Sequence, residues 1–232
     1  MSAKVLLVRH MEDRRDDRVA VHLERRGLQL HWCNPSKGDA LPGMSGEYAA
    51  AVVYGGVQSV NEAQRHAYLR AELDWIQRWV ADDRPYLGLC LGAQLLARAL
   101  GADVAPHPGG RHEIGFVAVR PTAAGRAYFP DVLHVYQWHY EGFIVPPGGE
   151  LLAIGETFPN QAFRVARRAF GLQFHPEATP QMRKDWLDAS ADALSAPGAH
   201  ARARQEEDAR QFEQPMEDWL LNFIDAHLLG GC

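Results

Sequence analysis

Residues 85–101, PYLGLCLGAQLLARALG, hold a short apolar strand, a tight turn and an amphipathic helix in immediate succession. Tyr86–Leu89 has the length and apolarity of a buried strand, and Leu91–Leu100 has helical spacing closed by a glycine. Cys90 stands alone at the junction between the two. A strand that turns directly into a helix predicts an α/β fold. The side chain at such a turn is accessible at the edge of the sheet where the strand ends.

The chain before this stretch alternates strands with helices. Apolar runs predict buried strands at Lys4–Arg9 and Ala49–Tyr54, and helical spacing predicts a helix over Arg18–Leu28. A second helix is expected after Ser59–Glu62, which has the pattern of a capping box. Strands that alternate with helices predict an open, mostly parallel sheet with helices on both faces.

The chain after residue 101 is richer in strand and turn signals than the part before it. Short strands are expected at Val117–Arg120, Val132–Tyr136 and Gly142–Val145, and then a meander at Leu151–Thr157, Ala162–Val165 and Ala169–Phe174.

The C-terminal fifty residues predict helices. Thr179 and Pro180 suit the cap and first position of one helix, and Pro215 is expected to open a last helix with an apolar stripe at Trp219, Leu220, Phe223, Ile224 and Leu228. We therefore expect a main domain over residues 1–180 and a helical extension over 181–232 packed on it. Residues 191–214 read as an insertion without motifs, and the charged stretch 198–212 is expected to be exposed, with RARQEEDAR in it as a solvated helix face.

The composition excludes several classes of protein. The chain has 232 residues, 47% of them hydrophobic and 23% charged, with a formal net charge of −5, which suits a globular domain rather than a nucleic-acid-binding one. No apolar run approaches the roughly 18 residues that span a bilayer, and the N-terminus lacks a signal-peptide pattern, so we expect a cytoplasmic protein. The three cysteines, Cys33, Cys90 and Cys232, have neither disulfide-framework nor zinc-site spacing.

Cys90 lies where a catalytic nucleophile is expected. A nucleophile on a strained strand-to-helix turn needs small neighbours, and Gly88 and Gly92 supply that room. The N-terminus of the following helix would stabilise a thiolate. Taken alone, this motif fits a buried structural cysteine between glycines equally well.

A second motif, Gly171–Glu177 (GLQFHPE), supplies a histidine and a carboxylate. In an extended segment residues i and i+2 point to the same side, and the proline between them favours that conformation. His175 and Glu177 would then lie side by side as a base and its orienting acid. The chain order of Cys90, His175 and Glu177 differs from that of α/β-hydrolases, in which the acid precedes the histidine.

With Tyr54-Gly55-Gly56 at the end of an earlier strand, these motifs resemble a class I glutamine amidotransferase domain of the Cys-His-Glu type. The matching segments are YGGVQSVNE, PYLGLCLGAQLLARALGA, HEIGF, QWHYEGF, PNQAFRV and GLQFHPE, and the similarity is greatest to stand-alone, GMP-synthetase-like members. The resemblance implies a flavodoxin-like open sheet, with Cys90 as nucleophile, His175 as base and acid, and Glu177 as its orienting group.

The resemblance also implies the remaining site residues. The backbone N–H groups of Gly56 and Leu91 would form the oxyanion hole. Gln94 would contact the bound glutamine, and the backbone around His139 and Tyr140 would complete the pocket. The implied reaction is hydrolysis of the glutamine side-chain amide through a thioester, releasing ammonia and glutamate, with no metal or organic cofactor.

Three functions stay open at this point. The ammonia of a glutaminase normally feeds a synthase, and the chain has no ATP-binding motif, so a separate ammonia-accepting synthase subunit would be the partner. A free-standing γ-glutamyl peptide hydrolase would use the same triad on a different leaving group. A catalytically silent binding module usually loses the cysteine or the histidine, whereas this chain has both.

Overall fold

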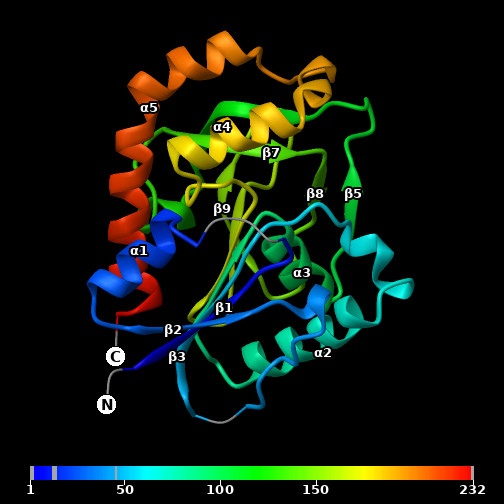
Figure 1. The fold of residues 1–232 in the computed structure, drawn as a ribbon, viewed down its shortest axis with the longest axis vertical. Coiled ribbons are helices and arrows are strands. Elements are labelled where there is room, and N and C mark those ends of the chain that lie inside the picture. Colours follow the sequence, from blue (N-terminus) through cyan, green and yellow to red (C-terminus); the bar gives the residue numbers. More distant parts are fainter. Residues whose placement is uncertain (1–2, 12–14, 45, 231–232) are drawn as a thin grey trace.

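The computed structural model describes residues 3–11, 15–44 and 46–230. A nine-stranded sheet runs through it in the order β2-β1-β3-β4-β11-β10-β9-β6-β7, and β5 pairs with β8 in a small ribbon (Figure 1). The strands are β1 (Lys4–Val8), β2 (Gln29–Cys33), β3 (Tyr48–Val53), β4 (Tyr86–Leu89), β5 (Val104–Pro106), β6 (Glu113–Pro121), β7 (Leu133–His139), β8 (Glu141–Phe143), β9 (Glu150–Ile154), β10 (Ala162–Val165) and β11 (Ala169–Leu172).

Helices cover both faces of the parallel part of this sheet. They are α1 (Arg18–Arg25), α2 (Ala67–Ala81), α3 (Leu91–Ala99), α4 (Pro180–Ala189) and α5 (Arg202–Phe223). Short 3₁₀ turns are η1 (Pro35–Lys37), η2 (Val60–Gln64), η3 (Ala124–Ala127) and η4 (Ala191–Ser195), and a π-helical turn, η5 (Ile224–Leu228), follows α5. α1 and α5 lie on one side of the sheet, and α2 and α3 on the other (Figure 1).

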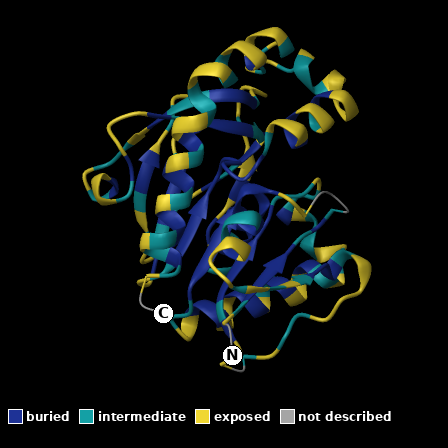
Figure 2. Ribbon diagram, turned by 60° about the vertical axis from the view of Figure 1, so that its left-hand side comes forward, coloured by how far each residue is buried: buried dark blue, intermediate teal, exposed yellow. Residues whose placement is uncertain are grey.

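The apolar sequence of β1 explains this layered arrangement. Successive side chains of a strand point to opposite faces, so Val5 and Leu7 join the core under α1 and α5, while Leu6 and Val8 join the core under α2 and α3. All four are fully buried. Figure 2 shows the central strands buried and the outer helix faces exposed.

The α/β sheet expected from the sequence is confirmed. Strands β2, β1, β3, β4 and β11 pair in parallel, and β10, β9, β6 and β7 continue the sheet in antiparallel pairing. The edge strand β2 is not predicted from the sequence. Its residues QLHWC alternate between exposed and half-buried along most of its length, so the strand lacks the apolar run that marked its neighbours.

The C-terminal residues form a longer helix than expected. α5 starts at Arg202 and runs through Pro215, so the prediction that Pro215 opens the last helix is wrong. The apolar stripe is buried as predicted, with Trp219 stacked on Phe129 at a centroid distance of 4.8 Å. Packing of this stripe stabilises the helix enough to offset the loss of the backbone hydrogen bond that proline cannot donate. The division of the chain near residue 180 stays a prediction.

The charged part of α5 is mostly solvent-exposed, as predicted, but two of its side chains pack on the sheet. Gln205 is buried and accepts a hydrogen bond from the Tyr136 hydroxyl at 3.0 Å. Phe212 stacks on His134 with ring centroids 3.8 Å apart. This stretch is therefore attached to β7 along its inner face.

Candidate active site

The turn at Cys90 is strained. Cys90 has φ of +49° and ψ of −105°, a backbone conformation that residues other than glycine rarely adopt. Its N–H donates to the Leu172 carbonyl at 2.8 Å. It lies between β4 and the first residue of α3, as the sequence predicts. A strained residue held by neighbouring backbone is typical of a functional position.

The two glycines around Cys90 are required by close backbone contacts. A Cβ on Gly88 would lie 2.4 Å from the Gly92 carbonyl oxygen, and a Cβ on Gly92 would lie 2.0 Å from the Val53 carbonyl oxygen. Both neighbours are main-chain atoms, which cannot move aside as a flexible side chain would. The expectation that small residues make room for the turn is confirmed.

We expect Gly92→Ala to destabilise the protein by about 3 kcal/mol, because the added methyl group overlaps the backbone of β3. Gly43→Ala is the matched control, since a Cβ there meets no atom within 4 Å. Urea denaturation of both variants measures the difference. Equal free energies of unfolding would contradict the close packing of α3 on β3.

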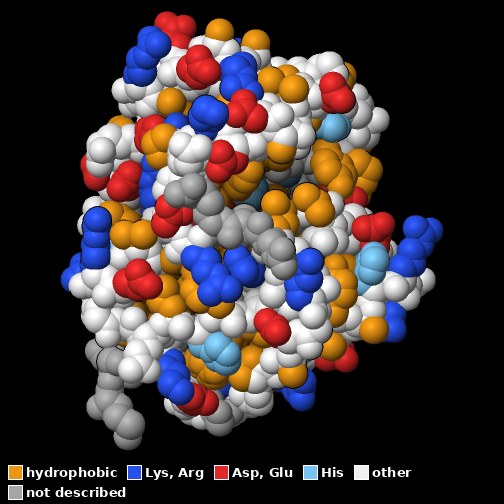
Figure 3. Space-filling view, viewed as in Figure 1, with side chains coloured by type: hydrophobic (Ala, Val, Ile, Leu, Met, Phe, Trp, Pro, Cys, Tyr) orange, Lys and Arg blue, Asp and Glu red, His pale blue; other side chains and the backbone are white. Residues whose placement is uncertain are grey.

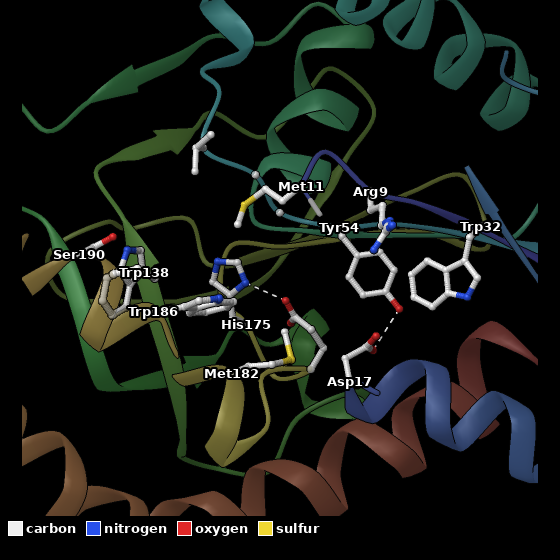
Figure 4. A pocket seen from close by; sticks show the side chains of 15 residues that line it. Arg9, Met11, Asp17, Trp32, Tyr54, Trp138, His175, Met182, Trp186 and Ser190 are labelled. Atoms are coloured by element: carbon white, nitrogen blue, oxygen red, sulfur yellow. Dashed lines mark hydrogen bonds and ion pairs between the residues drawn. The ribbon is translucent and has the colours of Figure 1, made fainter. Parts of the chain in front are cut away.

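His175 follows β11, the strand that pairs in parallel with β4. Leu172 is in register with Leu89, so the ends of the two strands bring His175 and Cys90 to the same sheet edge. The His175 N–H donates to the Tyr136 carbonyl at 2.8 Å, and Nδ1 donates to Glu177 Oε1 at 2.8 Å. Both side chains are buried, and a dashed line in Figure 4 marks the hydrogen bond of His175 to this carboxylate.

The electrostatic setting of His175 favours the imidazolium. Burial lowers the pKa of His175, but the charges and hydrogen bonds of Cys90 and Glu177 outweigh it and raise this pKa to about 10. Glu177 Oε2 is buried and has no hydrogen-bond partner among the described residues. Among the described residues, the Glu177 carboxylate thus makes its one side-chain hydrogen bond to the histidine.

The Gly55-Gly56 loop lies against both of these side chains. A Cβ on Gly55 would lie 2.6 Å from His175 Cε1 and 3.5 Å from Cys90 Cβ, and one on Gly56 would lie 3.0 Å from Leu91 Cδ2. The predicted oxyanion residues, Gly56 and Leu91, are therefore neighbours beside Cys90. Their role stays a prediction.

A buried ion pair that the sequence analysis did not single out supports this loop from behind. His10 Nδ1 donates to the Gly55 carbonyl at 3.4 Å, and its Nε2 lies 3.0 Å from Glu72 Oε2. Burial lowers the pKa of His10, but the Glu72 carboxylate and the Gly55 and Tyr54 carbonyls raise it by more, so the net shift is upward. Both side chains are inaccessible to solvent.

The predicted substrate residues lie on α3 and at the end of β7. Gln94 Nε2 donates to the Glu141 carbonyl at 3.0 Å and approaches Gln173 Oε1 at 3.4 Å. The His139 ring points into a buried network, where Nε2 donates to Glu113 Oε2 at 3.0 Å. Tyr140 is half exposed. His139 is thus held by its side chain, which leaves only its backbone for a ligand.

Asp17, the N-cap of α1, is a further buried carboxylate at this site. Its Oδ1 accepts from the Ala20 N–H and from the Tyr54 hydroxyl, each at 3.0 Å. Burial, with the charge of Glu177, raises the pKa of Asp17 to about 7 against the lowering effect of these hydrogen bonds. In the sequence it carries only the signature of a helix cap.

We expect Asp17→Asn to stabilise the protein more at pH 8 than at pH 4.5. The folded-state pKa is raised, so the stability that the wild-type carboxyl contributes is present below pH 4 and lost as pH rises through about 7. The asparagine can still accept both hydrogen bonds but does not ionise, which avoids a cost of a few kcal/mol at pH 8.

Urea denaturation at the two pH values measures this effect. Asp192→Asn on the exposed η4 turn is the control. A difference between Asp17→Asn and the wild type that is the same at both pH values would show that Asp17 does not titrate in this range.

Cys33 has a different environment from Cys90. Cys33 is buried in the core, and burial, with Asp39 and Glu72, raises its pKa to about 11. Cys232 lies outside the described residues. Among the residues that the structure describes, no three His, Cys, Asp or Glu side chains are grouped so that they could hold a metal ion.

Comparison with known proteins identifies the family. A family model described as glutamine amidotransferase class-I matches residues 17–191, which is more than half of the chain. The chain belongs to the class I glutamine amidotransferase family. It is 31% identical over 211 residues to YfeJ of Salmonella typhimurium, a glutamine amidotransferase-like protein, with 87% of each chain covered.

Two further comparisons agree with this family. The chain is 34% identical over 118 residues to the glutamine-hydrolysing GMP synthase of Aeropyrum pernix, a match that covers 49% of this chain and 23% of the synthase. The structure of a glutamine amidotransferase from Thermotoga maritima superposes with a TM-score of 0.88 at 28% identity, covering 98% of this chain and 99% of that chain. No helix in the described part of this amidotransferase-family chain is both long and apolar enough to cross a membrane.

Proposed function

We propose that this protein hydrolyses the side-chain amide of glutamine through a thioester on Cys90, releasing ammonia and glutamate. The observation that carries the proposal is the meeting of three features at one sheet edge. These are the strained turn at Cys90, the His175–Glu177 hydrogen bond of 2.8 Å, and the glycine loop that touches both the cysteine and the histidine.

Each group has a defined task in this mechanism. The Cys90 thiolate attacks the amide carbon, and the N–H groups of Gly56 and Leu91 stabilise the developing oxyanion. The His175 imidazolium gives its proton to the departing nitrogen and then accepts one from the water that hydrolyses the thioester. Glu177 holds the imidazole in place.

The amino-acid end of glutamine would bind on the side of Cys90 where the Gln94 amide lies. The carbonyl of Glu141, which accepts from Gln94, belongs to the segment after His139 and Tyr140. The backbone there would hold the amino-acid part of the substrate. Under this proposal the ammonia would pass to a separate synthase subunit in the cytoplasm, and no cofactor would take part.

A γ-glutamyl compound is the alternative substrate for the same triad, because only the leaving group differs. The cavity beside His175 favours this alternative, since it offers a leaving group more room than ammonia requires. An assay of glutamate release from glutamine and from γ-glutamyl peptides, including glutathione, distinguishes the two. Release from none of them would contradict the proposed function.

The pH dependence of kcat/KM provides an independent test. We expect activity to persist at alkaline pH and to fall as the His175 imidazolium deprotonates near pH 10, because that proton is needed by the leaving nitrogen. Glu177→Gln removes a charge that raises this pKa, so the alkaline limb should move to lower pH. A limb that does not move, with the variant still folded by circular dichroism, would contradict the role given to Glu177.

A further inference from the structure

A cavity of about 260 Å³ lies beside His175. Its walls come from the segments that follow β1, β3 and β11, from the N-cap of α1, from the ends of β2 and β7, and from α4. Figure 4 shows the indole rings of Trp138 and Trp186 on one side of His175, with Met11 and Met182 above and below. In the space-filling view, hydrophobic side chains surround a hollow beside α4 (Figure 3).

The cavity borders His175 and lies next to Cys90. Gly55, which borders it, lies against His175 and Cys90, and Trp138, which also borders it, has its carbonyl oxygen 4.0 Å from Cys90 Sγ. His175 itself forms part of the wall. A leaving group that takes its proton from His175 would therefore enter this space.

The cavity is distinct from the place assigned to the glutamyl part. None of the predicted substrate residues, Gln94, His139 and Tyr140, borders it. The acyl part is thus assigned to Gln94 and the backbone near His139, and the leaving group to the cavity that the Trp138 ring borders.

The size of the cavity does not match ammonia. A water-sized molecule, such as ammonia, occupies about 30 Å³ in a liquid. The cavity is several times larger, and approaches the lower end of the range for pockets that hold small organic ligands. A leaving amine that carries an organic group would fill it.

The walls indicate what kind of group this is. The Trp138 and Trp186 rings have centroids 5.9 Å apart and meet at 68°, so a planar ring could lie against the face of one indole and the edge of the other. Trp186 also packs edge-on to His175 at 4.9 Å. Of the charged groups in the wall, Asp17 accepts from Tyr54, Glu177 accepts from His175 through one of its two oxygens, and Arg9 lies over the Trp32 ring. An apolar, preferably aromatic, group fits these surroundings.

We propose that the preferred substrates are γ-glutamyl amides whose amine carries an aromatic or similarly apolar group, and that the Trp138–Trp186 cavity holds this group. The proposal rests on the proposed function, because it uses the same nucleophile and the same thioester. It names the leaving group as the part of the substrate that this cavity selects.

The reaction consumes one water and needs no other reactant. Cys90 Sγ forms a bond to the γ-carbonyl carbon, the C–N bond breaks, and His175 gives its proton to the nitrogen, so the free amine leaves from the cavity. Water then attacks the thioester, passes a proton to His175, and releases glutamate and the Cys90 thiolate. The products are one glutamate and one primary amine.

The test compares γ-glutamylbenzylamide with γ-glutamylmethylamide, and both with glutamine. The two amides release unhindered primary alkylamines, so they differ mainly in the phenyl ring. We expect kcat/KM to be at least tenfold higher for the benzylamide, which corresponds to about 1.4 kcal/mol of additional transition-state binding. A smaller ratio would overturn the proposal.

Variants in the cavity should change that ratio. Ser190, an exposed residue directly after α4, borders the cavity, so Ser190→Trp should fill its mouth. We expect the benzylamide-to-methylamide ratio to fall at least fivefold in Ser190→Trp and in Trp186→Ala. Gln181→Trp, an exposed position on α4 that does not border the cavity, is the control and should keep the wild-type ratio.

The ratio separates this proposal from the proposed function. Because both amides use the same triad, a general loss of catalytic power lowers kcat/KM for both equally and leaves their ratio unchanged. Hydrolysis of glutamine with no preference for the benzylamide would overturn the leaving-group assignment and leave the proposed function standing. Hydrolysis of none of the three compounds would overturn both.

Discussion

Replacing Cys90 with alanine should lower kcat for hydrolysis of glutamine or a γ-glutamyl amide by about 10⁶-fold, to the level of the background reaction. The thioester cannot form without the sulfur, and loss of the nucleophile in related acyl-transfer triads has an effect of about 10⁶-fold. The fold should survive, because the strain at this turn comes from the backbone and is the same for alanine.

Release of glutamate by purified Cys90→Ala measures this effect, with circular dichroism and urea denaturation as checks of the fold. Cys33→Ala is the matched control, since Cys33 is also buried but lies in the core under α2. It should keep wild-type kcat. A Cys90→Ala variant that stays folded and retains more than about 1% of the activity would contradict the assignment of the nucleophile.

The second large effect is expected at His175. His175→Ala should be nearly as damaging as loss of Cys90, because members of a triad act as a unit, whereas Glu177→Gln should be less damaging, with an effect of about 10⁴-fold. The imidazole remains in Glu177→Gln, but the group that accepts from its Nδ1 at 2.8 Å loses its charge.

Measurements of kcat for both variants against one substrate test this order. Glu217→Gln is a suitable control, because Glu217 pairs with Arg18 on the α1–α5 side of the fold and touches neither His175 nor Cys90. Full activity of Glu177→Gln, together with an essential role for Asp17, would move the third position of the triad from Glu177 to Asp17.

The parts of this site that could be predicted from the sequence are those encoded in short motifs. The turn at Cys90 depends on glycines two residues to either side, and the contacts of Gly88 and Gly92 explain why no larger residue could replace them. The His175–Glu177 pair lies on one short turn, in which the Ala178 N–H donates to the His175 carbonyl at 3.3 Å, and not on the extended segment that the sequence predicts. Local geometry decides each, so the local sequence is sufficient.

The parts that could not be predicted depend on contacts between distant segments. Asp17 is next to Glu177 because α1 packs near the end of β11, and its sequence signal is only that of a helix cap. The Glu113–His139 and His10–Glu72 pairs join residues 26 and 62 positions apart. The Trp138–Trp186 cavity likewise forms between β7 and α4. No local pattern marks such pairs before the fold is known.

The continuation of α5 through Pro215 shows the same limit. Proline favours the first turn of a helix, which is why the sequence predicts a start there. In the structure the helix on both sides of Pro215 is anchored, by Gln205 to Tyr136 before it and by Trp219 to Phe129 after it. Tertiary packing outweighs the local preference.

The most direct test of the central claim is to map the residue that a glutamine-like chloroketone alkylates. The reagent places its reactive carbon where the amide carbon of the substrate would be attacked. We predict one adduct per chain, on the peptide that contains Cys90, formed more slowly in the presence of a substrate. An adduct mainly on Cys33 or Cys232, or no adduct at all on a folded protein, would contradict the assignment of Cys90 as the nucleophile.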